Sequence, residues 1–371
     1  MQIKPFKLER YFAAYEFSVK YLLSSSDCEA LTQGELLSYA SDAHRSLWDD
    51  LKLGYTESRG HPLLLESIAS LYQGIDPANV MEVVPEEGIF IAMNTLLQAG
   101  DHVVVTYPAY QSLYQVADSL GCSVSHWLPD QRNWQFDVSD LARLIHSGTR
   151  LIVINFPHNP TGAMLTPEQF QQVIDLAERH DCILFSDEMY RWSEHDAADR
   201  LPSACERYEN AVSLCGLSKT FALPGLRTGW LVTRNDAFMQ RFTLFKDYTT
   251  ICGSAPGEIL AIVALDAKER IIDRTLRIVN DNLSVLDKFF AQYHDILRWH
   301  RPKAGTITLA ELLPDLPIDQ FAADLVMTSG VMIVPASQFD MDGNYFRLGF
   351  GRHNLPEALE HFEGFLQQAV S

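Results

Sequence analysis

Apolar residues fall into short runs through the middle of the chain, from about residue 45 to residue 250. Each run is bounded by glycine, proline, asparagine or aspartate, and several runs are apolar throughout instead of alternating with polar residues. Such runs are typical of strands that are buried on both faces of a mostly parallel sheet. The pattern predicts strands at Val103–Thr106, Val124–Trp127, Leu151–Asn155, Ile183–Ser186, Ala211–Cys215 and Trp230–Thr233.

Helical patterns lie between these runs, and one of them is well marked at its start. Thr166 is suited to cap a helix, Pro167 suits the first helical position, and Gln169 completes a Thr-x-x-Gln capping box. Strands that alternate with helices in this way predict the α/β class, with a mostly parallel sheet flanked by helices.

The pattern changes after Pro256. Residues Glu258–Gln292 have the composition of one long helix, rich in Leu, Ile, Ala, Asp and Arg. Shorter elements follow it, namely strands at Ile307–Glu311, Val331–Val334 and Tyr345–Gly349 and a closing helix from Pro356.

A chain of 371 residues suits two packed domains. We interpret residues 45–255 as a large α/β domain. The first forty residues contain no series of strands of their own, so we assign residues 1–44 together with 256–371 to a smaller α+β domain that includes the long connecting helix.

Charge and composition narrow the class of protein further. The net charge of −19 argues against nucleic acid as a partner, because a phosphate backbone needs a basic surface. No long apolar run indicates a membrane span, and the charged N-terminus does not resemble a signal peptide, so we expect a cytoplasmic protein. The six cysteines form no CxxC pair and the twelve histidines no HExxH motif, so we expect neither disulfides nor a metal site.

Polar residues follow four of the predicted strands. In open α/β sheets ligands bind outside the carboxyl ends of the strands, so these residues are candidates for a site. Each has an ordinary explanation when taken alone, because Asn-Pro forms turns, aspartate caps helices and lysine is common on surfaces. The candidates are Tyr110 in YPAY, Asn159 in FPHNPTG, Asp187 and Tyr190 in SDEMY, and Lys219 and Arg227 in GLSKTFALPGLRTG.

The motifs HNPTG, SDEMY and LSKTFALPGLRTGW, in this order and at these separations, resemble fold-type-I enzymes that use pyridoxal 5′-phosphate, of the aspartate-aminotransferase superfamily (classes I and II). The resemblance extends from GYTESRG near residue 54 to FRLGFGR near residue 346. It implies the pyridoxal-phosphate-dependent transferase fold, pyridoxal 5′-phosphate as cofactor, and an aminotransferase whose substrates are an amino acid and a 2-oxo acid.

The resemblance also implies roles for individual residues. Lys219 matches the lysine that carries the cofactor as a Schiff base and then moves a proton at the substrate α-carbon. Asp187 matches the carboxylate that keeps the pyridine nitrogen protonated. Asn159 and Tyr190 match donors to the ring's phenolic oxygen, and Tyr110 matches the aromatic residue that stacks on the ring.

For the cofactor phosphate, the resemblance implies Arg227, Ser218 and backbone N–H groups at the start of a helix. Counting back along the chain places that turn at Val84-Pro85-Glu86-Glu87. The turn departs from the usual Gly/Ser/Thr composition, and proline offers no N–H, so Glu86 and Glu87 would contribute their backbone only.

Two further positions concern the substrate and the partner subunit. Arg347, in YFRLGFGR, matches the arginine that binds the substrate α-carboxylate, with Asn159 nearby. Tyr55, in GYTESRG, matches the tyrosine that reaches the phosphate of the neighbouring subunit, so the resemblance implies a homodimer with shared active sites.

Two other functions remain open at this stage. The segments LERYFAAYEF and LLSSSDCEALT resemble capreomycidine synthase, which cyclises a hydroxylated arginine, so a cyclase or lyase is the alternative to an aminotransferase. By this resemblance they replace the more usual glycine-containing turn that lines the substrate site. A non-catalytic regulator that binds pyridoxal phosphate is disfavoured, because such proteins carry a DNA-binding module and this chain is strongly acidic. The side chain of the substrate is not indicated by the motifs.

Overall fold

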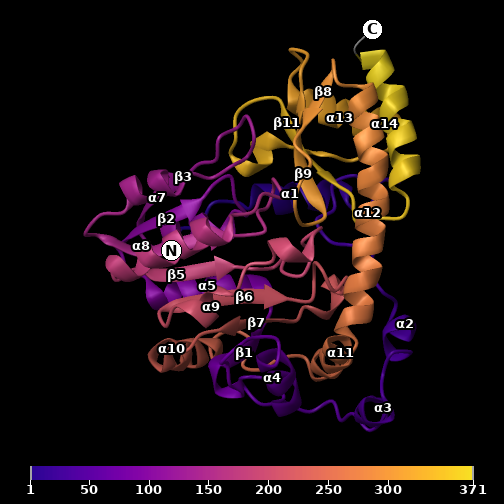
Figure 1. Ribbon diagram of the computed structural model, residues 1–371. Helices are drawn as coiled ribbons and strands as arrows, with labels where there is room; N and C mark the ends of the chain where they lie inside the picture. Colours follow the sequence, from indigo (N-terminus) through magenta and orange to yellow (C-terminus); the bar gives the residue numbers. More distant parts are fainter. Residues whose placement is uncertain (1, 370–371) are drawn as a thin grey trace.

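The computed structural model describes residues 2–369, and its largest element is a seven-stranded sheet (Figure 1). The strands are β1 (Val80–Val83), β2 (His102–Thr106), β3 (Ser123–Trp127), β4 (Thr149–Asn155), β5 (Ile183–Asp187), β6 (Ala211–Gly216) and β7 (Gly229–Val232). Their order is β1-β7-β6-β5-β4-β2-β3. Strands β2 to β6 pair in parallel, whereas β7 runs antiparallel to both of its neighbours. The prediction of an α/β fold with a mostly parallel sheet is confirmed.

The helices, like the strands, keep close to the pattern of apolar residues. They are α1 (Lys7–Tyr15), α2 (Gln33–Leu37), α3 (Asp42–Asp49), α4 (Pro62–Ala69), α5 (Pro85–Leu96), α6 (Ser112–Ser119), α7 (Val138–Leu144), α8 (Pro167–Arg179), α9 (Ala204–Arg207), α10 (Asp236–Lys246), α11 (Ala255–Asp266), α12 (Lys268–Gln292), α13 (Ile318–Ser329) and α14 (Leu355–Ala369). Helix α8 begins with the predicted capping box at Thr166 and Gln169. Within the described range, no helix is long and apolar enough to cross a membrane.

Both faces of the inner strands of the large sheet are buried, which explains why these strands are mainly apolar, whereas the edge strand β3 is partly exposed and more polar. Along β4, Ile152 packs into the cluster formed with α7, α8 and α9, and its neighbour Val153 packs into the cluster formed with α5, α6 and α10. Successive side chains of a strand point to opposite faces, so a strand covered on both sides needs apolar residues at every position.

A second, antiparallel sheet stands beside the first and is covered by α12, α13 and α14 (Figure 1). Its strands are β8 (Leu297–Trp299), β9 (Ile307–Leu312), β10 (Val334–Pro335) and β11 (Tyr345–Gly349), in the order β10-β11-β9-β8. The long helix α12 runs beside both sheets, and α1 lies between them (Figure 1).

Four details differ from the expected elements. The single helix expected over Glu258–Gln292 is two helices, α11 and α12, because the backbone leaves helical geometry at Ala267. Val331 forms only an isolated bridge with Tyr21, and the strand begins at Val334. Strands β1 and β8 were not anticipated. In β1 the apolar run is interrupted by Glu82, which is buried against Lys246.

The division into domains stays a prediction. Residues 297–349 contain the strands of the smaller sheet, and the N-terminal segment contacts this part of the chain through the bridge between Tyr21 and Val331. The outer limits of that predicted domain, residues 1 and 370–371, lie outside the described residues.

Candidate active site

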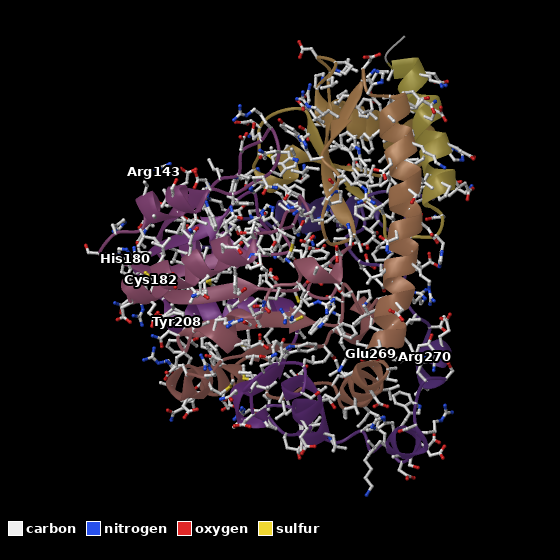
Figure 2. The ribbon with its side chains drawn as sticks, in the orientation of Figure 1. Arg143, His180, Cys182, Tyr208, Glu269 and Arg270 are labelled. Atoms are coloured by element: carbon white, nitrogen blue, oxygen red, sulfur yellow. The ribbon has the colours of Figure 1, made fainter. Side chains whose placement is uncertain are left out.

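Strands β4, β5 and β6 are parallel neighbours, so their carboxyl ends lie at the same edge of the large sheet, and Figure 1 shows the arrows of β5 and β6 pointing toward α12. Asn155 and Asp187 end their strands side by side as register partners, and Lys219 follows the end of β6 by three residues. The opposite edge of the sheet is held by contacts within the fold. There the Tyr208 hydroxyl donates to the carbonyl oxygen of Cys182, and Figure 2 labels both residues.

Lys219 is a largely buried lysine without a counter-ion. Its Nζ donates to Ser26 Oγ at 2.7 Å, and no carboxylate among the described residues forms an ion pair with it. Burial lowers the pKa of this amine, although the charge of Asp27 opposes the shift. A buried lysine whose pKa is lowered is the kind of amine that acts as a nucleophile or base.

Asp187 is a buried carboxyl that can accept further hydrogen bonds. Its Oδ1 accepts from the backbone N–H of Met189 at 3.1 Å, and no cationic side chain forms an ion pair with it within the described structure. Burial raises its pKa to about 6, and the nearby charge of Lys219 counteracts part of this effect. A cation placed against this carboxyl would restore its ionised form.

Asn155 is a positioning residue that sequence reasoning missed. Its Nδ2 donates to the backbone carbonyl of Asp187 at 3.0 Å, and its Oδ1 accepts from the backbone N–H of Asn159 at 2.8 Å. One amide therefore fixes the two chain segments that follow β4 and β5. The available signal was a polar residue that closes an otherwise apolar strand and is 1% exposed.

Arg347, on β11, is a buried guanidinium without an anionic partner. It is 1% exposed, and its two terminal nitrogens donate to Asn159 Oδ1 at 3.4 Å and to the carbonyl oxygen of Ser24 at 2.9 Å. Its Nε has no hydrogen-bond partner in the described structure. A buried charge in this state is costly unless an anion joins it. The arrangement favours a carboxylate ligand at Arg347.

The segment Ser24–Ser26 joins the lysine to the arginine, and its individual serines were not among the predicted site residues. Ser24 accepts from Arg347, and Ser26 Oγ accepts from Lys219. The carbonyl oxygen of Ser26 also accepts from the Tyr190 hydroxyl at 2.9 Å and from Thr306 Oγ1 at 2.8 Å. The sequence signal was the resemblance of LLSSSDCEALT, which implies this segment at the substrate site in place of a glycine-containing turn.

Helix α1 covers the site from the other side of this segment. The ring of Tyr110 packs against that of Phe6 with centroids 4.8 Å apart, and its hydroxyl donates to Glu9 Oε1 at 2.9 Å. Lys7 forms an ion pair with Asp340 beside the small sheet. The helix therefore contacts elements on both sides of the site.

The predicted phosphate turn lies at the start of α5, which begins at Pro85. The Glu87 side chain turns back to accept from the N–H of Val84 at 3.3 Å, whereas Glu86 Oε2 accepts from Ser112 Oγ at 3.0 Å. Burial raises the pKa of Glu86 to about 7, with further increases from Glu9 and Asp187. A carboxyl with this pKa is largely neutral in weakly acidic solution.

The structure brings Lys219, Asp187, Asn159, Tyr190 and Arg347 to the same place, with Tyr110 beside them. Two predicted residues stand apart. Arg227 is exposed and its Nη1 donates to the carbonyl of Pro224 at 2.8 Å, although its charge still lowers the pKa of Glu86. Tyr55 is 92% exposed and has no contact with this site within one subunit. Ser218 is buried next to Lys219.

Comparison with known proteins identifies the class. The profile of the family described as aminotransferase class I and II matches residues 20–362. The chain belongs to this family, and it is an enzyme that depends on pyridoxal 5′-phosphate.

Individual relatives include enzymes with different reactions. Capreomycidine synthase of Streptomyces vinaceus is 29% identical over 347 residues, which cover 92% of this chain and 87% of that protein. A pyridoxal-phosphate-dependent aminotransferase from Streptococcus suis superposes with a TM-score of 0.93 at 29% identity, over 99% of both chains. The pyridoxal-phosphate-dependent cyclase OrfR superposes with a TM-score of 0.91 at 26% identity, over 100% of this chain and 98% of that one.

The residues at this edge of the sheet fit the cofactor. An aldehyde needs an amine that is not held by a carboxylate, and Lys219 Nζ has only the hydroxyl of Ser26. A protonated ring nitrogen needs a buried carboxyl with a free oxygen, and Asp187 supplies one. The Lys219 amine and the Asp187 carboxyl are therefore both available, one to the aldehyde and the other to the ring nitrogen of the cofactor.

Glu86 leads to a prediction about cofactor affinity. Because its pKa is raised to about 7, it is neutral below that pH and charged above it, where it would repel the cofactor phosphate. Glu86→Gln should therefore bind pyridoxal phosphate like the wild type near pH 6 and up to ~10-fold more tightly near pH 8. Fluorescence titration of both apoproteins with pyridoxal phosphate over this pH range gives the ratio of the two dissociation constants. The pH dependence of Lys219 is the same in both proteins and cancels in this ratio. A ratio that stays constant with pH would contradict the prediction.

Proposed function

We propose that this enzyme transfers the amino group of an α-amino acid to a 2-oxo acid, and that Lys219 holds the cofactor as a Schiff base. The observation that carries the proposal is the pairing of Lys219 with Arg347 through the single segment Ser24–Ser26. An amine site and a carboxylate site that share one short segment suit a ligand whose amino and carboxylate groups are one carbon apart. Such a ligand is an α-amino acid.

Pyridoxal phosphate, when bound, supplies an electron sink for the charge that develops at the substrate α-carbon. Asp187 would keep the ring nitrogen protonated, because an opposite charge at hydrogen-bond distance favours the charged form. Asn159 and Tyr190 would donate to the phenolic oxygen, and Tyr110 would lie against the ring. For the Tyr190 hydroxyl, this donation replaces the one that it makes to Ser26.

The Lys219 amine would then have a second task. When it is not bonded to the cofactor, Lys219 Nζ would accept the proton from the substrate α-carbon and donate the same proton to the cofactor, so that the amine ends unchanged. Burial lowers its pKa, which increases the fraction of the amine that is unprotonated and able to accept a proton. Ser26 Oγ, at 2.7 Å, would hold the amine in position during this transfer.

For the phosphate we propose the backbone N–H groups of Glu86 and Glu87 at the start of α5, where the helix dipole favours an anion. Ser218 and Arg227 would complete the site. Arg227 has to turn away from Pro224 to do so, and its exposure leaves that movement open.

We further propose a homodimer with shared sites. Large apolar side chains that stay exposed in the single chain gather on two segments, with Leu53 and Tyr55 on one and Leu244, Tyr248 and Ile251 on the other. A hydrogen bond from Ser58 to Asp247 places these segments side by side. Exposed apolar surface of this kind marks protein–protein contacts. Sedimentation should therefore give a dimer, and a monomer with bound cofactor would contradict this.

A stopped-flow absorbance screen of amino acids against the holoenzyme tests the proposed reaction. A donor for transamination should convert the cofactor from its aldehyde to its amine form, with one 2-oxo acid released per site. If no amino acid produces this conversion, the proposal of an aminotransferase fails.

The alternative is a cyclase or lyase, and it is favoured by the similarity to capreomycidine synthase and to the cyclase OrfR. The same screen separates the two reactions. A cyclase or lyase should alter the cofactor spectrum only transiently and return it to the aldehyde form, with no 2-oxo acid that retains the substrate's carbon skeleton.

Arg347 provides a test of the carboxylate site. Arg347→Lys keeps the charge but loses the planar pair of donors that fixes a carboxylate. We expect KM for amino acids to rise and kcat to fall, with kcat/KM reduced by ~10- to 100-fold, as expected for a hydrogen bond to a charged group. Steady-state kinetics with an amino acid and with a plain amine check this. The amine has no carboxylate and should lose little, whereas equal losses for both would mean that Arg347 is structural.

A further inference from the structure

We propose that Thr220 and the turn Glu188–Arg191 are positioning residues, which fix Lys219 relative to Asp187. The lysine and the aspartate belong to neighbouring strands, since Asp187 closes β5 and Lys219 follows β6 (Figure 1). A cofactor that bonds to one of them and pairs with the other needs both at a constant separation. The inference rests on the proposed function, because it takes Lys219 as the lysine that binds the aldehyde.

The turn after β5 is tied to β6 by its first residue. The backbone N–H of Glu188 donates to the carbonyl oxygen of Leu214 at 2.8 Å, and the Cys215 thiol donates to the carbonyl oxygen of Glu188 at 3.4 Å. Glu188 Oε1 accepts from Ser213 Oγ at 2.9 Å and from the backbone N–H of Ala204 at 2.9 Å. Glu188 therefore joins the turn both to β6 and to the start of α9.

The last residue of the turn holds the neighbour of the lysine. The backbone N–H of Arg191 donates to the carbonyl oxygen of Glu188 at 2.8 Å, which closes the turn. The carbonyl oxygen of Arg191 accepts from Thr220 Oγ1 at 2.8 Å. Thr220 is 1% exposed and follows Lys219 directly in the chain. This network of contacts runs from β5 through the turn to Thr220, and the chain returns from Thr220 to β6.

The Arg191 side chain keeps this end of the turn in place. Its Nη1 donates to the carbonyl oxygen of Leu201 at 2.7 Å and lies 3.8 Å from Glu188 Oε2. The guanidinium also lies over the Trp192 ring, with Cζ 5.3 Å from the centroid. Because both charged side chains are buried, water and salt screen their attraction little. We therefore expect the turn to have little freedom where Thr220 binds it.

Loss of the Thr220 hydroxyl would release the lysine from the turn. Burial is the main reason for the lowered pKa of the Lys219 amine. An amine that can move toward water regains part of its hydration, so its pKa rises toward the ordinary value. The charged groups that also act on this amine stay as they are, namely Asp27, Arg347, Glu9 and Asp187.

The test measures how fast pyridoxal phosphate attaches to the full-length apoprotein at different pH values. Only the unprotonated amine condenses with the aldehyde, with loss of water, so the pH profile of this rate reports the pKa of Lys219. Thr220→Val keeps the shape of the side chain but has no hydroxyl. We expect its profile to shift to higher pH by up to about one unit, the order expected for one hydrogen bond. Below the midpoint of the profile, the rate should fall by up to ~10-fold.

Two further variants test the network itself. Thr220→Ser restores the hydroxyl and should return the profile to that of the wild type. Ser213→Ala interrupts the network at its other end by removing a donor to Glu188, and it should shift the profile in the same direction as Thr220→Val. If Thr220→Val does not fold, Ser213→Ala decides the question alone.

Thr308→Val is the matched control. Thr308 is buried like Thr220, and its hydroxyl also donates to a backbone carbonyl oxygen, at 3.4 Å. It lies on the face of β9 that packs against the cluster of α12, α13 and α14. The profile of this variant should coincide with that of the wild type. An equal shift in Thr308→Val would show a general effect of lost packing and would overturn the inference.

Two other negative results are distinguishable. If the profile of Thr220→Val coincides with that of the wild type, or if Thr220→Ser shifts as far as Thr220→Val, the positioning role is wrong. The proposed function then stands, provided that borohydride attaches the cofactor to Lys219. A pyridoxyl group on a different lysine would refute the proposed function, and the inference with it.

Discussion

Replacing Lys219 with alanine should lower the rate of amino-group transfer by ~10⁴-fold, the upper range for the loss of one group in general acid–base catalysis. The variant loses both the amine that holds the cofactor and the base that moves the α-proton. The protein should still bind pyridoxal phosphate, because the phosphate site and Asp187 remain. Single-turnover absorbance measurements with saturating cofactor give the rate.

Two observations sharpen this expectation. Borohydride should attach a pyridoxyl group to Lys219 in the wild type, as peptide mapping can show, and to no lysine in Lys219→Ala. A small primary amine added to the variant should restore part of the activity, since it can enter the space that the side chain leaves. A pyridoxyl group on a different lysine of the wild type would refute the assignment.

Asp187→Ala should reduce turnover by ~10²- to 10³-fold, the range seen when one preorganised electrostatic group is removed from an active site. Without the carboxylate, the ring nitrogen loses the charge that keeps it protonated, so the cofactor becomes a poor electron sink. The measurement is kcat with the best amino acid from the screen, at saturating cofactor.

Asp187→Asn is the matched variant, because it keeps the size of the side chain and the hydrogen bond from Met189 but removes the charge. It should lose nearly as much activity as Asp187→Ala. Near-normal turnover in the asparagine variant would show that packing, and not charge, is what this residue provides.

Much of the large sheet could be predicted because its strands are buried on both faces. Strands such as β5 and β6 are apolar apart from one small serine each and their final residues, and β11 was predicted at its observed limits. Strand β1 was not predicted because it contains Glu82, whose burial is made possible by Lys246, 164 residues further along the chain. No local pattern contains that information.

The same distinction separates the parts of the site. Residues that follow strands, such as Asp187 and Lys219, could be predicted because the topology of a parallel sheet brings strand ends together. For Ser26 only the segment LLSSSDCEALT was implied by resemblance, because the contact of this serine with Lys219 depends on where the N-terminal segment lies against the rest of the fold. Asn155 was overlooked because it was counted as the last residue of a strand.

The contact between Ser24 and Arg347 joins residues 323 positions apart, and this separation constrains how the protein can be made. During synthesis the N-terminal segment leaves the ribosome among the first residues, whereas its arginine partner is among the last. The strands of the large sheet are complete well before that, and domains generally fold as units from the N-terminal side. The nascent enzyme therefore possesses a scaffold long before it possesses a substrate site. Closing so long a loop adds little entropy cost beyond that of a moderate one, so this late assembly is a matter of timing more than of stability.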